Sequence, residues 1–235
     1  MAGIEGLVRA LREGDDAAKT AAARALFFGG SASDAYRVAA AGGIPPLVDL
    51  LRDGSMGAKE QAAAALGMLA LTTPDNNRVA IVEAGVILLL VELLRDGSAD
   101  AKRWAAWTLG NTASNSLDTN PTTDTRILIA EAGGVPPLVQ LLRDGSVHAK
   151  AQATRVLGHL AYNNDGNAIA IAVAVGFEAL VQLARRGRVN FEGRWVLDAG
   201  VPAKRKAALV VATLLRDSVP DSVPDEMKAL IAPYL

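Results

Sequence analysis

The sequence predicts an all-α protein built from a tandem array of helical repeats, an α-solenoid. Alanine and leucine abound while aromatic residues make up only 4% of the chain, which favours closely packed helices over a sheet. A turn of the form Arg-[Asp/Glu]-Gly recurs with its glycine at Gly14, Gly54, Gly97 and Gly145, and a degenerate copy ends at Gly187. The spacings of 40, 43, 48 and 42 residues are typical of repeats of two or three helices.

Composition excludes several classes of function. The chain of 235 residues is 51% apolar and 21% charged, with a formal charge of -1, so no bulk charge favours nucleic acid or a membrane surface. The most apolar run, residues 86–94, is interrupted by Glu92 and is too short for membrane insertion. The absence of cysteine and of an apolar signal segment predicts a cytoplasmic or nuclear location.

Each repeat is expected to contain a short, a medium and a long helix. In the motifs at 42–46 and 133–137, Gly-Gly-[Ile/Val]-Pro-Pro, a glycine ends the first helix in a left-handed conformation. The prolines then fit the first turn of the second helix, where no amide donor is needed. The second helix, for example over 45–52, ends at Gly54, and Ser55 is the expected N-cap of the third helix.

The third helix of the middle repeat, AKRWAAWTLGN at 101–111, has two faces. Steps of three and four residues place small and apolar side chains on a stripe expected to be buried: Ala105, Ala106, Leu109 and Thr112. A second stripe carries large aromatic and amide side chains and is the expected working surface: Trp104, Trp107 and Asn111.

These patterns resemble a known family. The segments GGIPPLVDLLRDGSMGAKEQAAAALGMLA (42–70), GVILLLVELLRDGSADAKRWAAWTLGNTA (85–113) and GGVPPLVQLLRDGSVHAKAQATRVLGHLA (133–161) resemble armadillo repeats, the units of importin-alpha and the catenins. The resemblance covers about residues 4–186 and implies a right-handed superhelix with three helices per repeat.

The two ends depart from this pattern. The solenoid is expected over 1–216 as about five repeats, with an insertion at 187–200 in the last, and 217–235 is expected to form a linker and a capping helix. We place the last third helix near 204–214, although the segment 195–202 also imitates a junction between a first and a second helix.

The first repeat lacks its first helix and begins directly in its second. We therefore expect a bare apolar face that could promote homo-oligomer formation, made of Ile4, Leu7, Val8 and Leu11.

The resemblance implies that third helices line a concave groove for extended peptides, with a recurring Trp-x-x-x-Asn pair. Trp107 and Asn111 match this pair. The other repeats place Arg24, Ala64, Arg155 and Leu209 in the tryptophan column, and Phe28, Met68, His159 and Thr213 in the asparagine column. Because most of the ladder is missing, importin-like binding of basic cargo is not expected.

The predicted groove residues are Trp104, Trp107, Asn111, Arg103, Arg155, His159, Gln152, Gln61, Met68, Arg24 and Phe28. The cations predicted on this surface, Arg24, Arg103, Arg155, Arg205 and Lys206, face only Glu60. This charge favours an acidic or mixed apolar protein segment as partner. The alternative is that Trp104 fills a gap between helices and the arginines form a solvated face.

Catalytic patterns are weak. The only histidines, His148 and His159, are about three helical turns apart and too distant for shared metal ligation. The sequence therefore predicts a non-catalytic interaction scaffold without cofactor or metal. Two alternatives stay open, namely a helical-repeat enzyme resembling HEAT-type bilin lyases, which would carry a coloured ligand, and a structural oligomer.

Overall fold

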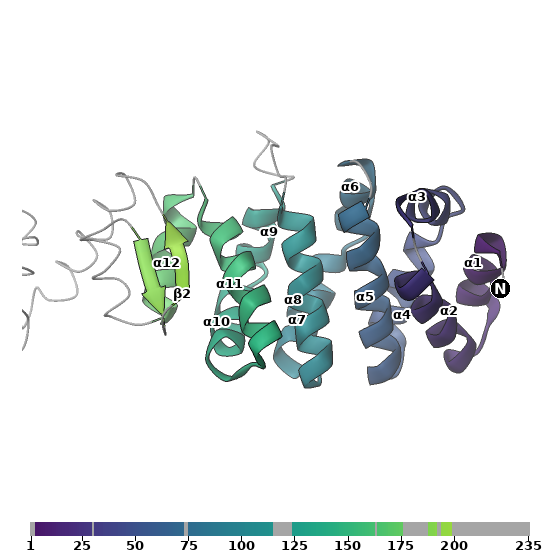
Figure 1. Ribbon diagram of the computed structural model, residues 1–235, viewed down its shortest axis with the longest axis horizontal. Coiled ribbons are helices and arrows are strands. Elements are labelled where there is room, and N and C mark those ends of the chain that lie inside the picture. The colour runs from purple at the N-terminus through teal and green to yellow at the C-terminus, as the bar shows by residue number, and fades with distance from the viewer. Residues whose placement is uncertain are drawn as a thin grey trace, which may run out of the picture. The chain divides into compact units, whose positions relative to one another are not determined.

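The computed structural model describes residues 3–29, 31–72, 75–114, 124–162, 164–175, 188–191 and 194–198. These residues belong to two compact units, Met1–Val156 and Leu157–Leu235, and the first unit carries most of the helices (Figure 1).

The helices follow the predicted order of short, medium and long. The first repeat contains α1 (Ile4–Glu13) and α2 (Asp16–Gly29), and the second contains α3 (Ala32–Ala40), α4 (Ile44–Asp53) and α5 (Met56–Thr72). The third contains α6 (Asp75–Glu83), α7 (Val86–Asp96) and α8 (Ala99–Ala113). The fourth contains α9 (Thr125–Glu131), α10 (Val135–Asp144) and α11 (Val147–Ala161), whose last turns belong to the second unit.

The turns between helices have the predicted geometry. Gly42 and Gly133 adopt φ angles of 71° and 74°, the left-handed conformation that ends the first helix of each repeat. Pro45 and Pro46 occupy the first turn of α4, and α10 begins in the same way. The hydroxyl of Ser55 accepts a hydrogen bond from a backbone amide of α5 at 3.4 Å, and Ser98, its equivalent in the next repeat, accepts one from α8 at 3.0 Å. Each stop and start predicted from these residues is therefore confirmed.

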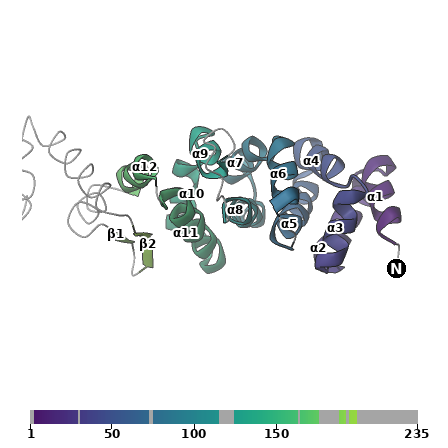
Figure 2. The same cartoon turned by 90° about the horizontal axis from the view of Figure 1, so that it is seen from above.

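The core lies between the helices of neighbouring repeats. All four residues of the predicted buried stripe of α8 are buried, with Ala105, Ala106 and Leu109 at 0% exposure and Thr112 at 3%. Helix α5 packs against both α2 and α8, and Figure 2 shows these third helices along one side of the first unit. We call the surface formed by α2, α5, α8 and residues 147–156 of α11 the third-helix face.

The predicted bare face of the first repeat is wrong. Ile4, Val8 and Leu11 are buried and Leu7 is partly buried, because the apolar stripe of α1 packs against α2, α3 and α4. The self-association expected through this face loses its basis, since little apolar area is exposed there.

The second unit contains a further helix and a short hairpin. These are α12 (Asp165–Val175), β1 (Arg188–Phe191) and β2 (Arg194–Asp198), and the two strands are antiparallel. The all-α class is confirmed for the repeats, but the hairpin in the 187–200 insertion was not predicted. The sequence feature that could have predicted it is a pair of short runs with aromatic and β-branched residues on either side of Glu192-Gly193.

The hairpin bears on one of the two interpretations of the last repeat. Residues 195–198 form part of β2, so the alternative that places them in a first helix is wrong. The third helix expected near 204–214, the capping helix expected near 224–232, and the cations Arg205 and Lys206 lie outside the described residues. Among the described helices, none has the length and apolar character needed to cross a membrane.

Candidate functional site

An aromatic cluster occupies the third-helix face. It consists of Phe27 on α2 with Trp104 and Trp107 on α8, and we call these three rings the aromatic cluster. The Phe27 ring centroid lies 4.8 Å from that of Trp104 and 6.0 Å from that of Trp107, and the two tryptophan centroids are 5.6 Å apart. All three pairs meet edge to face, the arrangement that aromatic quadrupoles favour. The rings are half-buried and therefore keep part of their surface exposed.

Small residues on α5 allow rings from α2 and α8 to meet across it. A Cβ added at Gly67 would lie 2.5 Å from the Trp107 ring and 2.5 Å from the Thr108 hydroxyl. Because real Cβ atoms do not approach so closely, the Trp107 position requires glycine at residue 67. Ala64, in the tryptophan column of α5, is also small and buried.

Phe27 was not predicted as a groove residue. This residue occupies the position in its repeat that Gly67 and Gly110 occupy in later repeats, and that bulky replacement of a glycine was the available signal.

Two guanidinium groups stack on aromatic rings of this face. Arg103 lies 4.0 Å from the Trp104 ring centroid and also forms an ion pair of 2.9 Å with Asp100. Arg24 lies 5.7 Å from the ring centroid of Phe28, which is 72% exposed. Stacked cations of this kind keep their charge at the rim of an apolar surface.

Asn111 does not have the surface position that the sequence predicted. Its side chain is 1% exposed, donates to the Gly67 carbonyl at 2.9 Å, and accepts from the Arg155 guanidinium at 2.9 Å. The pattern of steps along α8 could not reveal this, because the burial arises from α5 on one side and α11 on the other. Asn111 therefore links three successive repeats.

Arg155 spans the junction between α11 and α8. Its guanidinium donates to the Asn111 side chain at 2.9 Å, to the Trp107 carbonyl at 3.1 Å, and twice to the Gln152 side-chain oxygen at 2.9 and 3.2 Å. Gly110 provides the room, since a Cβ there would lie 2.6 Å from a guanidinium nitrogen. Burial lowers the pKa of Arg155, because loss of water disfavours its charged form.

The remaining predicted groove residues lie on α5 and α11. Gln61 and Met68 are half-buried on α5, and His159 is half-buried in the part of α11 that belongs to the second unit. Glu60, the predicted counter-charge, accepts a hydrogen bond from the Ser98 hydroxyl at 2.5 Å.

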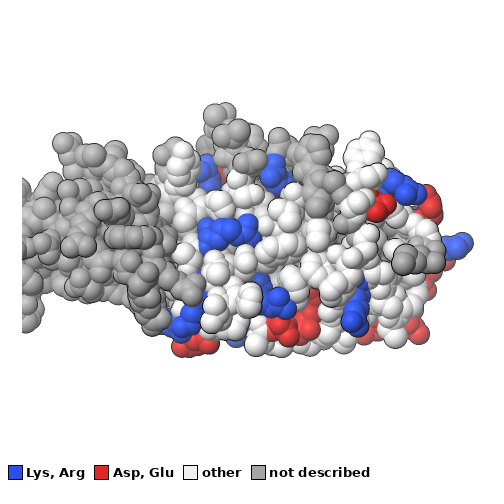
Figure 3. Space-filling view, in the orientation of Figure 1, with Lys and Arg blue, Asp and Glu red and all other residues white. Residues whose placement is uncertain are grey.

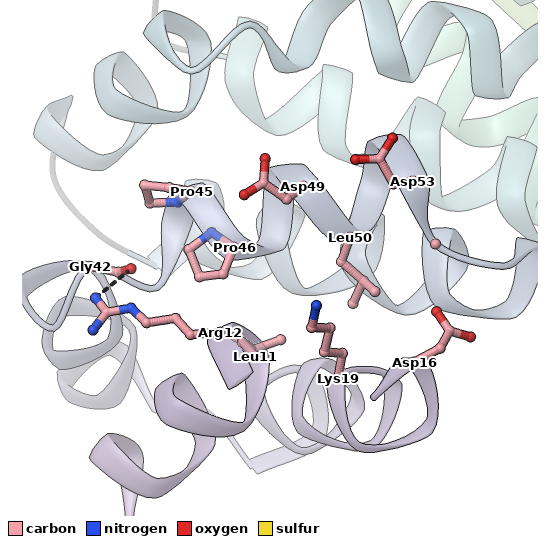
Figure 4. A pocket seen from close by; sticks show the side chains of 11 residues that line it. Leu11, Arg12, Asp16, Lys19, Gly42, Pro45, Pro46, Asp49, Leu50 and Asp53 are labelled. Atoms are coloured by element: carbon pink, nitrogen blue, oxygen red, sulfur yellow. Dashed lines mark hydrogen bonds between the residues drawn. The ribbon is translucent and has the colours of Figure 1, made fainter. Parts of the chain in front are cut away.

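A pocket lies where the first and second repeats stack against each other. It has a volume of about 520 Å³ and lies between α1, α2 and α4. Figure 4 shows the Arg12 guanidinium reaching the carbonyl of Gly42. Arg12 also donates a hydrogen bond to the Ala41 carbonyl at 2.7 Å. Arg95 donates in the same way to Ala132 at 3.3 Å, beside an equivalent pocket of about 740 Å³. At these two junctions, the arginine of the recurring turn thus caps the first helix of the next repeat.

The chemistry of the third-helix face suits binding. It offers exposed aromatic area, guanidinium groups and the side-chain amides of Gln61 and Gln152. In the part of the chain that the structure describes, no three His, Asp or Glu side chains are grouped so as to hold a metal ion.

The family assignment rests on the repeats. The armadillo/beta-catenin-like repeat pattern matches residues 36–70, 74–114 and 122–162. The chain belongs to this family, as the resemblance predicted.

Solved structures agree on the fold. One engineered protein is 27% identical, covers 100% of this chain and 96% of its own, and has a TM-score of 0.67. A second engineered protein is 28% identical over 100% of this chain and 57% of its own, with a TM-score of 0.69. A designed armadillo repeat protein in complex with the peptide (KR)4 is 24% identical over 100% of both chains, with a TM-score of 0.66. Among curated proteins, none matches this chain.

Proposed function

We propose that this protein is a non-catalytic interaction scaffold whose third-helix face binds an extended segment of a partner protein. The observation that carries this proposal is the aromatic cluster. Three large rings from two repeats meet on one face and stay half-buried, although the chain is poor in aromatic residues. Rigid aromatic side chains in such positions are typical anchors of binding surfaces, because they bury much area and lose little conformational entropy.

The charge around the cluster favours a partner with both apolar and acidic side chains. Arg24 stacks on the Phe28 ring of this face, and the hydrogen-bond partners of Arg155 in the described part of the chain are all uncharged. Arg103 stacks on Trp104 but is paired with Asp100, and Glu60 accepts a hydrogen bond from Ser98. Figure 3 shows Lys and Arg atoms in the middle of this face, and Lys and Arg together with Asp and Glu atoms along its lower edge and at the N-terminal end. Such a field attracts an acidic segment and disfavours a basic one.

The way in which the partner is held differs from an asparagine ladder. Both polar atoms of the Asn111 side chain are already bonded within the chain, to Gly67 and to Arg155. The partner backbone therefore cannot rely on Asn111, and affinity comes from side chains on the rings and cations. A designed protein with this fold was solved in complex with the basic peptide (KR)4. The fold can therefore hold a peptide, and the charge preference follows from the residues of each chain.

Tryptophan fluorescence tests this proposal directly. The chain has three tryptophans, so a Trp195→Phe background leaves Trp104 and Trp107 as the reporters. Titration with a panel of extended peptides should give a saturable emission change for members that combine leucine or phenylalanine with glutamate. Adding Trp104→Phe to this background leaves Trp107 alone, and this control measures how much of the emission change comes from that single indole. If no peptide of the panel changes the emission, the proposal is wrong.

A further inference from the structure

Arg155 is a half-buried cation whose partners on the protein are all uncharged. Its four hydrogen bonds go to the Asn111 side chain, the Trp107 carbonyl and the Gln152 side chain. Within the described residues, no carboxylate contacts this guanidinium. A charge withdrawn from water is costly unless it is paired, and neutral oxygens compensate it only in part.

Arg103, the predicted groove arginine on α8, differs from Arg155 in its partner. Arg103 has a carboxylate partner on its own helix, Asp100 at 2.9 Å. Its charge is therefore already compensated, whereas the charge of Arg155 is not. A guanidinium also carries five N–H donors, and the four bonds of Arg155 leave one N–H on Nη1 for a further acceptor.

We propose that Arg155 is the anchor for a carboxylate of the partner segment, an aspartate or glutamate side chain that completes the ion pair. This inference rests on the proposed function and names the charged group that the third-helix face recognises. A carboxylate accepts charge-assisted hydrogen bonds from a guanidinium, and these are stronger than the bonds to neutral oxygens. Asn111 and Gln152 hold the guanidinium in place before the partner arrives, so little side-chain entropy remains to be lost.

Arg155 also contacts the backbone of a residue whose ring belongs to the aromatic cluster. Its Nη2 atom lies 3.1 Å from the carbonyl of Trp107, whose ring belongs to the aromatic cluster. In an extended chain, side chains two positions apart point to the same side and are separated by roughly 6 to 7 Å. A segment with an apolar side chain and a carboxylate two residues apart is therefore the one to test against the aromatic cluster and Arg155.

The test uses two short peptides that differ in one functional group. The first has a central leucine with a glutamate two positions to either side, in a glycine and serine background, so that either chain direction is accommodated. The second has glutamine in place of both glutamates. Affinities for the full chain are measured by isothermal titration calorimetry in low and high salt.

We expect the glutamate peptide to bind about tenfold or more tightly than the glutamine peptide in low salt. Arg155→Gln should remove this preference while leaving the affinity for the glutamine peptide nearly unchanged. Arg103→Gln is the matched control, since it removes one positive charge from the same face, and it should keep most of the preference. Circular dichroism melting confirms that each variant is folded.

A charge exchange provides the second variant. Arg155→Glu should reverse the preference, so that a peptide with lysine in place of both glutamates binds better than the glutamate peptide. This gain of binding cannot arise from unfolding.

Each other outcome has a defined meaning. If both original peptides bind equally and Trp107→Ala weakens both, the Arg155 anchor is wrong and the proposed function stands. If Arg103→Gln abolishes the preference as fully as Arg155→Gln, the general field decides and the anchor is again wrong. If neither peptide binds, both the anchor and the proposed function fail.

Discussion

Two successive junctions of the third-helix face share one backbone plan and differ in what fills them. Between α5 and α8, the glycine at residue 67 faces the ring of Trp107, and between α8 and α11, Gly110 faces the guanidinium of Arg155. The first junction contributes rings to an apolar cluster, and the second holds a cation among neutral oxygens. One column of the repeat can therefore carry either packing or charge, provided that the facing residue of the preceding repeat is glycine.

Leu109→Ala should have the largest effect, because this side chain lies in the core of α8, the helix that both junctions share. Leu109 is 0% exposed, and its truncation should lower the free energy of unfolding by about 2 to 5 kcal/mol. Urea denaturation followed by circular dichroism measures the change. A loss below about 1 kcal/mol would show that α8 is not buried as described.

Gly67→Ala should destabilise the first junction by about 1 to 3 kcal/mol, since the new Cβ meets the rigid Trp107 ring and the buried Thr108 hydroxyl. Gly110→Ala should cost less, because the Arg155 side chain that it meets is flexible and can shift. Gly57→Ala, on α5 where nothing lies within 4 Å, is the matched control and should be neutral or slightly stabilising. Equal losses at residues 67 and 110 would erase the contrast between the junctions.

Asn111→Ala should destabilise by about 1 to 3 kcal/mol, because it removes the amide that joins the Gly67 carbonyl to Arg155 and strands buried polar groups. Thermal and urea melting of the variant provide the measurement. Asn111→Asp keeps the size but loses the donor to the Gly67 carbonyl, and its bond to Arg155 becomes an ion pair, so it shows what the donor to Gly67 contributes when the contact with Arg155 is kept or strengthened. An unfolding free energy unchanged in Asn111→Ala would mean that this amide does not hold the repeats together.

The sequence predicted the fold well because its signals are local. The glycines and prolines of the turns, the serine caps and the alanine–leucine stripe each act within one helix or turn. Their outcomes at Gly42, Pro45, Ser98 and Leu109 therefore follow from backbone rules that any single repeat obeys.

The site was harder to predict because its properties arise between repeats. Spacing along α8 placed Asn111 beside Trp107, but its burial depends on Gly67 and Arg155, each more than forty residues away. Phe27 was missed for the same reason, since its partners are two repeats further along the chain. The hairpin of the second unit was missed because only its own short strands carried a signal.

The most direct test of the binding surface compares stability and affinity in Trp107→Ala. We expect this variant to lose less stability than Leu109→Ala, because the Trp107 ring is half-buried and Leu109 is fully buried. It should nevertheless lose about 2 kcal/mol or more of affinity for a peptide that combines leucine with glutamate, as expected of an aromatic anchor. If Trp107→Ala melts as early as Leu109→Ala while its folded fraction binds the peptide unchanged, Trp107 serves packing alone and the binding surface is not there.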